Sequence, residues 1–292
     1  MNSQTQNKEK KKSFFCRLIN KFKSNNNIIA VVNLSGIIGK VGKFENCLDI
    51  NKAEPLLIKA FDTKKLKAVA ININSPGGSP VQSELIYQRI RELSEEKKIP
   101  VFTFAQDVAA SGGYFLALAG DEIYAHDASI IGSIGVISAG FGFEKAIKKF
   151  GVSRRVYAQG KNKSILDPFL KEDKESIEIL NNAQKDVHES FKLLVRNRRS
   201  GKLNQSEEEL FNGAFWSGIT AARLGLIDKV GSMRSIMKEK YGDKIKFTNI
   251  EVKKKGIMRE LFSQKLDNFN SSLTDNIVNK IIQKSYFDKF GL

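Results

Sequence analysis

Short apolar runs alternate with longer amphipathic ones through the middle of the chain. Four of the short runs are rich in β-branched residues and have the length of buried strands; they cover residues 28–34, 68–74, 101–105 and 122–125. Apolar positions three or four apart predict helices at 53–60, 81–95, 113–119, within 170–200 and 215–226, and at 233–241. Strands that alternate with helices are typical of an α/β domain with a largely parallel sheet. We expect one such domain over residues 28–240.

The two ends of the chain differ from this domain in composition. The composition of residues 1–27 predicts a disordered, lysine-rich tail followed by a short helix at 13–23. This helix would place Phe14, Leu18 and Phe22 on one face and most of its cations off that face. A basic amphipathic helix of this kind can lie on an anionic membrane, or pack against the protein itself or a neighbouring subunit. Residues 241–292 are expected to form a basic C-terminal extension.

The charge of the chain does not by itself identify a partner. The net charge is +16, but much of the excess lies at the ends: residues 1–24 carry seven cations against one anion, and residues 252–292 carry eight against four. A strongly basic protein can bind nucleic acid or anionic lipid. The sequence contains no helix-turn-helix, zinc or RNP motif, so we expect no nucleic-acid partner. A hydrophobic content of 41% excludes a wholly disordered chain.

The cysteines and the apolar runs exclude several other classes. Cys16 and Cys47 are too few for a disulfide framework, and neither has a second cysteine or a histidine at metal-ligand spacing, so we expect no zinc site. No apolar run approaches the roughly 18–20 residues of a membrane-spanning helix, and the N-terminus lacks the apolar core of a signal peptide. We expect a cytoplasmic protein, with the 13–23 segment as a candidate contact for the inner face of the cytoplasmic membrane.

Two glycine-bearing turns follow predicted strands. The first, Asn-Ser-Pro-Gly-Gly-Ser at 74–79, could be a tight strand-to-helix turn and no more. The second, Ala-Ala-Ser-Gly-Gly-Tyr at 109–114, places Ser111 at the start of a helix, where the helix dipole favours developing negative charge. A serine there could also be an ordinary N-cap. The presence of both turns, in this order, favours a catalytic site.

These two turns carry a resemblance to a known family. The segments INSPGGS (73–79) and AASGGYFLA (109–117) resemble the signal peptide peptidase A family, also called protease IV or peptidase family S49, within the ClpP/crotonase superfamily. The resemblance covers about residues 28–240 and continues, in family order, through IIGSIGVI (130–137), GKNKS (160–164), FWSG (215–218) and GLIDKVG (225–231). It implies a ClpP/crotonase-like core and a serine peptidase that needs no metal, nucleotide or organic cofactor.

The resemblance also implies roles for individual residues. Ser111 matches the nucleophile, Lys163 the general base, and Ser133 a serine whose hydroxyl holds the lysine ammonium, although Gly132-Ser133 could instead be only a tight turn. The backbone N–H groups of Gly78 and Gly112 match the oxyanion hole.

Other residues could compete with Lys163 as the base. Lys161 lies two positions before it, and only the family register favours Lys163. A lysine base requires its pKa to be lowered by burial. The chain has two histidines, His126 and His188, and neither stands where the histidine of ClpP-like enzymes would fall.

The function implied is an endopeptidase that degrades small apolar peptides such as remnant signal peptides at the membrane. Single-unit members of the family form rings, often of eight subunits, in which the serine and lysine of one site come from neighbouring chains. Many members also have an N-terminal transmembrane anchor, which this sequence lacks. The alternatives are an inactive scaffold of the same fold and a crotonase-like acyl-CoA enzyme.

Overall fold

The computed structural model describes residues 27–39, 47–251, 287, 289 and 290. The helix predicted at 13–23 and most of the C-terminal extension lie outside the described residues. No helix in the described part of the chain is both long enough and apolar enough to cross a membrane.

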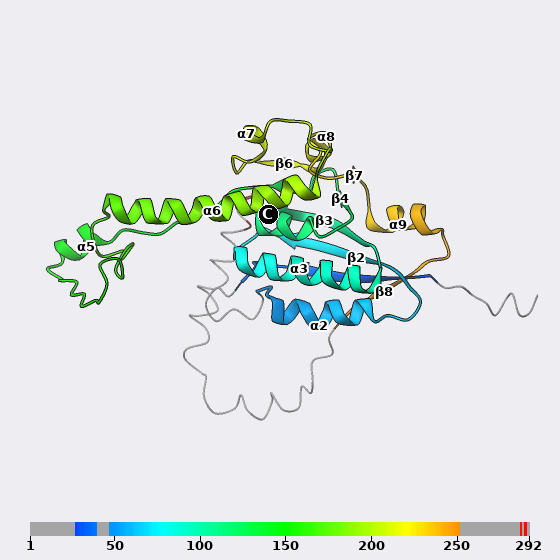
Figure 1. The fold of residues 1–292 in the computed structure, drawn as a ribbon, viewed down its shortest axis with the longest axis horizontal. Coiled ribbons are helices and arrows are strands. Elements are labelled where there is room, and N and C mark those ends of the chain that lie inside the picture. The colour runs from blue at the N-terminus through cyan, green and yellow to red at the C-terminus, as the bar shows by residue number, and fades with distance from the viewer. Residues whose placement is uncertain (1–26, 40–46, 252–286, 288, 291–292) are drawn as a thin grey trace, which may run out of the picture.

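An eight-stranded, mostly parallel sheet forms the centre of the molecule (Figure 1). Its main path runs β6-β5-β3-β2-β1-β8, while β4 pairs with β3 and β7. Among the strands of the described residues, only the pairing of β5 with β6 is antiparallel. The strands are β1 (Ile28–Ser35), β2 (Leu66–Ser75), β3 (Val101–Ala110), β4 (Glu122–Ala125), β5 (Ile130–Gly132), β6 (Phe215–Ser217), β7 (Lys229–Val230) and β8 (Lys246–Asn249). The predicted α/β fold with a largely parallel sheet is confirmed.

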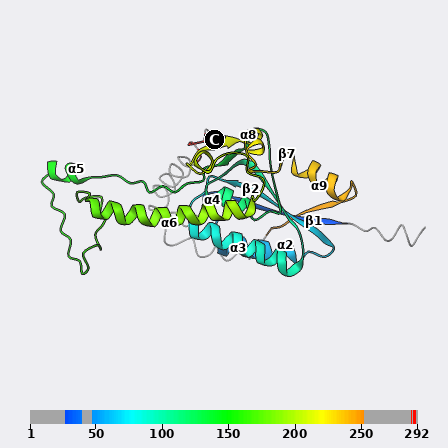
Figure 2. The ribbon, with the colours of Figure 1, turned by 45° about the horizontal axis from the view of Figure 1, so that its top comes forward.

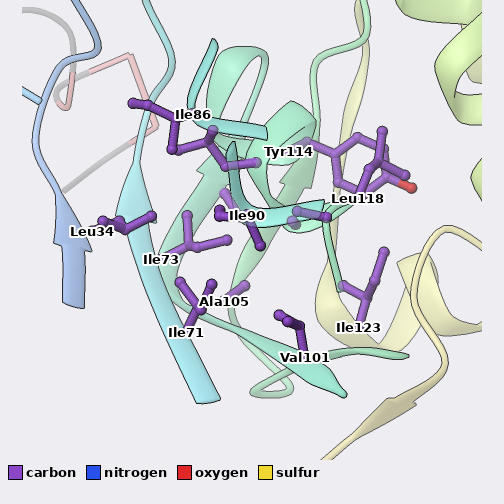
Figure 3. Packing of buried hydrophobic residues seen from close by; sticks show 14 of the residues in the cluster. Leu34, Ile71, Ile73, Ile86, Ile90, Val101, Ala105, Tyr114, Leu118 and Ile123 are labelled. Atoms are coloured by element: carbon purple, nitrogen blue, oxygen red, sulfur yellow. The ribbon is translucent and has the colours of Figure 1, made fainter. Parts of the chain in front are cut away.

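Helices cover both faces of this sheet. Successive residues of β1 alternate between two apolar clusters: Ala30 and Val32 belong to the larger one, and Ile29 and Val31 to the smaller one. Figure 3 shows side chains of the larger cluster. The larger cluster packs under α2 (Ile50–Phe61), α3 (Pro80–Lys97), α4 (Gly112–Ala117) and part of α6 (Lys174–Arg198), and the smaller one under α9 (Met233–Tyr241).

A long arm projects from this core. We define the arm as residues 135–172, which include α5 (Glu144–Lys149) and lead into α6. Both ribbon views show the arm and the first half of α6 extending well beyond the sheet (Figures 1 and 2). α6 has 25 residues, so it is about 37 Å long at 1.5 Å per residue. The arm therefore lies at the far end of a helix whose other end is anchored in the core.

The domain extends beyond the predicted boundary at residue 240. Residues 246–249 form β8, which pairs in parallel with Ile28–Val31 of β1. The sequence placed this segment in the C-terminal extension, because Lys-Phe-Thr-Asn has no apolar run that marks a strand. The two remaining helices of the described residues are α7 (Glu207–Leu210) and α8 (Gly218–Arg223). They flank β6 near the C-terminal end of α6, which is the end that packs on the core.

A buried ion pair anchors the C-terminal end of α6. Arg199 is 2% exposed, and its guanidinium donates to Gly225 O at 2.7 Å and to Asp228 Oδ2 at 2.8 Å. Burial raises the pKa of Asp228, but hydrogen bonds from Lys202, Arg199 and the Ile123 N–H outweigh it, so the net pKa lies below its usual range. The carboxylate thus stays charged at neutral pH and ties α6 to the loop before β7.

Removing this pair should destabilise the fold. The variant Arg199→Ala removes one of the two cations bonded to Asp228 and leaves Lys202 and the Ile123 N–H as its remaining partners, so we expect a loss of about 1–3 kcal/mol in the free energy of unfolding. The control Arg196→Ala on the same helix breaks an exposed pair with Glu207, worth less than about 1 kcal/mol. Urea titration of both variants measures the free energy of unfolding. Equal losses in the two variants would contradict the anchoring role of Arg199.

Candidate active site

Ser111 stands in a strained turn between β3 and α4. Its backbone has φ +53° and ψ −123°, a conformation that residues other than glycine rarely adopt. The N–H of Ser111 donates to Gly132 O at 2.8 Å, which ties this turn to the end of β5. Although Ser111 is the residue before α4, its side chain makes no capping hydrogen bond. The structure therefore does not support an ordinary N-cap serine, and the hydroxyl is available for chemistry.

The other glycine turn packs directly against Ser111. A Cβ added to Gly77 would lie 2.8 Å from Gly112 N and 2.8 Å from Ser111 Cβ, so only a glycine allows this approach. Ile38 holds the turn through two hydrogen bonds, from Ile38 N to Gly77 O at 2.9 Å and from Ser79 N to Ile38 O at 2.8 Å. The two motifs, separate in sequence, thus form one structure.

The N–H groups of Gly78 and Gly112 have no hydrogen-bond acceptor within the described part of the chain. Both belong to turns that meet at Ser111, and unpaired backbone donors beside a nucleophile are what an oxyanion hole requires.

A side chain at Gly78 should destroy this arrangement. Its φ is +144°, and an added Cβ would lie 2.1 Å from the carbonyl oxygen of Ile38, so Gly78→Ala must displace the turn. We expect peptide hydrolysis to fall by at least about 10²-fold, the cost of losing one oxyanion donor. Gly201→Ala is the control, because Gly201 also has a positive φ (+71°) but a Cβ there meets nothing within 4 Å. Steady-state kinetics on both variants checks the prediction, which fails if Gly78→Ala retains full activity.

Ser133 lies beside Ser111 at the end of the neighbouring strand. Ala110 pairs with Gly132 in the β3–β5 register, so the next residue of each strand is a serine. Ser133 is buried, has φ +53°, and donates its N–H to Ala214 O at 2.7 Å. Its hydroxyl has no partner in the described part of the chain, so it is free to accept a hydrogen bond from a lysine.

Lys163 is not brought to Ser111 within one chain. It is exposed in the arm, in the turn that follows Gly160. This turn lies at the N-terminal end of α6, where Lys161 contacts Glu175. Sixteen residues of α6, about 24 Å, separate Glu175 from Phe191, whose ring packs against Phe115 just after Ser111. The chain thus gathers Ser111, Ser133, Gly78 and Gly112 and leaves Lys163 at a distance.

The two lysines of this turn differ in their surroundings. Lys161 Nζ donates to both carboxylate oxygens of Glu175, at 2.6 and 2.9 Å. The hydrogen bonds and negative charge of Glu175 raise the pKa of Lys161, so Lys161 stays protonated near neutral pH and is less available to accept a proton. Lys163 has no ion-pair partner within the described ranges. Within the described residues, Lys163 is thus the lysine of this turn without an ion pair, and its assignment as the base stays a prediction from the family register.

Neither histidine is placed to activate Ser111. His126 is exposed just after β4, as expected of a residue at a strand end. His188 lies on α6, and its Nε2 is 3.2 Å from Ile134 O, next to Ser133 but hydrogen-bonded to the backbone.

Two supporting residues did not stand out as site residues in the sequence. Trp216 packs its ring against Gly132, where an added Cβ would come within 2.8 Å of it. Ser83 on α3 lies under Gly112, with its hydroxyl 2.5 Å from a Cβ placed there. The signal for Trp216 was that it is the one tryptophan of the chain and sits in the FWSG segment. Ser83 gave no signal, because a buried helix serine looks like any other small residue.

Comparison with known proteins matches the sequence of this chain to a protease family. The model of peptidase family S49 matches residues 94–244, more than half of the chain. A protein of Arabidopsis thaliana named Serine protease SPPA, chloroplastic, is 33% identical over 241 residues, which are 80% of this chain and 34% of that protein. A protein of Enterococcus faecium, named as a candidate signal peptide peptidase SppA, is 32% identical over 63% of this chain and 54% of its own length.

A third relative has an unrelated name. A protein of Brucella abortus named Na(+)/H(+) antiporter NhaA is 47% identical over 272 residues, which are 90% of this chain but only 37% of that protein. The chain thus spans between about a third and a little over half of these three relatives. The family match at 94–244 falls on the Ser111 site, so the shared region is the peptidase-like part.

Proposed function

The chain belongs to peptidase family S49, and from that premise we propose that it is a serine endopeptidase with a Ser111–Lys163 dyad that degrades small apolar peptides. The observation that carries the proposal is the strained Ser111 turn with two unpaired N–H groups beside it. This arrangement fits acyl transfer and argues against the inactive-scaffold alternative, which would not need a half-buried serine in a costly backbone conformation.

In the proposed mechanism, Ser111 Oγ attacks the scissile carbonyl carbon while Lys163 Nζ takes the hydroxyl proton. The N–H groups of Gly78 and Gly112 donate to the oxyanion of the tetrahedral intermediate. Lys163 then gives its proton to the leaving amine, and the acyl-enzyme remains on Ser111. Water attacks this ester with Lys163 again as the base, which releases the acid and restores the serine. Ser133 Oγ accepts a hydrogen bond from the lysine ammonium.

We place Lys163 at the Ser111 of a neighbouring copy, because its own Ser111 is out of reach. The arm that carries Lys163 exposes large apolar side chains, among them Phe141, Phe150 and Tyr157 at 82, 78 and 92%. Aromatic groups with this exposure are typical of an interface rather than of a free surface. Contact with a second chain would cover them and remove water from Lys163, which is the condition for a lysine base.

Apolar peptides are the substrate class that we propose, with remnant signal peptides as its members at the membrane. The relative from Enterococcus faecium, named as a candidate signal peptide peptidase, supports this choice. The expected location is the cytoplasmic side of the membrane, where such peptides are left. Residues 13–23, outside the described part of the chain, are the proposed peripheral contact.

The test combines covalent labelling with product analysis. A fluorophosphonate probe should label the assembled wild-type protein on Ser111, identified by mass spectrometry of the peptide that contains residue 111. The same assembly should cut internally quenched apolar peptides faster than charged ones of equal length. An assembled protein that neither takes the label nor cuts any peptide would contradict the proposal.

A further inference from the structure

The mechanism leaves one polar contact beside the site without a role. His188 Nε2 lies 3.2 Å from the carbonyl oxygen of Ile134, the residue after Ser133. A carbonyl can only accept, so the ring nitrogen must carry the proton and donate. Ile134 is fully buried, so losing this hydrogen bond would leave its carbonyl oxygen without the donor that His188 supplies, at a cost in free energy.

This contact completes the tertiary support of a three-residue segment. Gly132 O accepts from Ser111 N at 2.8 Å, Ser133 N donates to Ala214 O at 2.7 Å, and Ile134 O accepts from His188. The first two bonds are backbone to backbone and belong to the sheet region. The third comes from a side chain on another element, so it is the one that a substitution can remove.

His188 also stands at a boundary within α6. Towards its C-terminus, the helix is buried at Phe191 and Val195 and bonded to the core by Arg198 and Arg199. Towards its N-terminus, within the described ranges, no α6 residue before His188 has a hydrogen bond to the sheet domain. His188 is therefore the last bonded point before the helix projects towards the arm.

The length of the projecting part makes this point sensitive. Thirteen residues separate His188 from Glu175, which holds the lysine turn, so the lever is about 20 Å long. A rotation of only about 3° at His188 would shift the far end by about 1 Å, and a misplacement of 1 Å can cost on the order of 10² in rate.

We propose that His188 is a positioning residue that fixes the Ser133 segment and, through the same bond, the direction in which α6 presents Lys163. The expected effect of His188 on catalysis rests on the proposed function, whereas its effect on the order of the Ser133 segment does not. One hydrogen bond thus aligns two parts of the machinery: the Ser133 hydroxyl of this chain, and the lysine that it offers to its neighbour. Neutral imidazole with the proton on Nε2 and imidazolium can both make the bond.

The test compares three variants of the full-length assembled protein. His188→Leu removes the donor but keeps the bulk, His188→Gln keeps an N–H donor of similar reach, and Asn182→Leu places a leucine on an exposed part of the same helix as the control. Steady-state hydrolysis of an apolar peptide gives kcat and KM. Hydrogen exchange of peptides spanning 133–143 reports the Ser133 segment without relying on activity.

We expect His188→Leu to lower kcat about 10- to 100-fold with KM within about 3-fold, and to speed exchange over 133–143. His188→Gln should recover most of both, and Asn182→Leu should match the wild type. The proposal is overturned if His188→Leu behaves like the wild type, or if Gln is as damaging as Leu. If no wild-type assembly cuts any peptide, the proposed function fails, and the exchange data alone decide whether His188 holds the Ser133 segment.

Discussion

Replacing Lys163 by alanine is expected to lower kcat on the order of 10³-fold, and replacing Ser111 by alanine to lower it still further. Ser111 supplies the attacking oxygen, and without a base its hydroxyl is a weak nucleophile at neutral pH. Both substitutions act on side chains that the single chain leaves free of hydrogen bonds within its described part, so neither should alter folding.

Lys161→Ala is the matched control for Lys163→Ala. It removes a cation of the same size two residues away, and Glu175 already engages that cation. We expect kcat to change by only a few fold, because Lys161 takes no proton in the proposed mechanism and its exposed ion pair with Glu175 contributes less than about 1 kcal/mol to holding the turn. Peptide hydrolysis is measured for all three variants after their assembly states are shown to match. A Lys161→Ala loss as large as that of Lys163→Ala would leave the base unassigned.

The strands of the core could be predicted because each is a short apolar run that is buried on both faces. Their ends were harder to predict. β3 continues to Ala110, although the sequence predicts that it ends at Ala105. The prediction stops early because the exposed residues Gln106 and Asp107 interrupt the apolar pattern. Strands as short as β5 and β6 carry no periodicity, so only their pairing with longer strands makes them visible.

The candidate site divides in the same way. Each glycine turn could be predicted on its own, since a turn that requires glycine is a property of the local sequence, but the packing of Gly77 against Gly112 and Ser111 became visible only in the structure. The ion pair between Lys161 and Glu175 could not be predicted, because Glu175 contacts Lys161 only when the arm folds back on α6. The bond from His188 to Ile134 joins residues 54 positions apart, and a histidine in a charged helix gives no hint of it.

The arm shows the limit of hydrophobic pattern as a guide. Its aromatic residues resemble core positions in the sequence, yet Phe141 and Phe150 are exposed in the single chain. Burial within one chain therefore does not explain them, whereas the second copy that we propose would cover them and would also bring Lys163 to a serine.

Mixed assemblies test this central claim most directly. Ser111→Ala and Lys163→Ala chains, each inactive alone, are co-expressed with different tags and purified through both tags in turn. If each site takes its serine from one chain and its lysine from the next, about one pairing in four is intact, and the mixture should regain about a quarter of the wild-type rate. A mixed assembly that contains both chains and shows no activity would contradict the account, because it would mean that serine and lysine must come from the same chain.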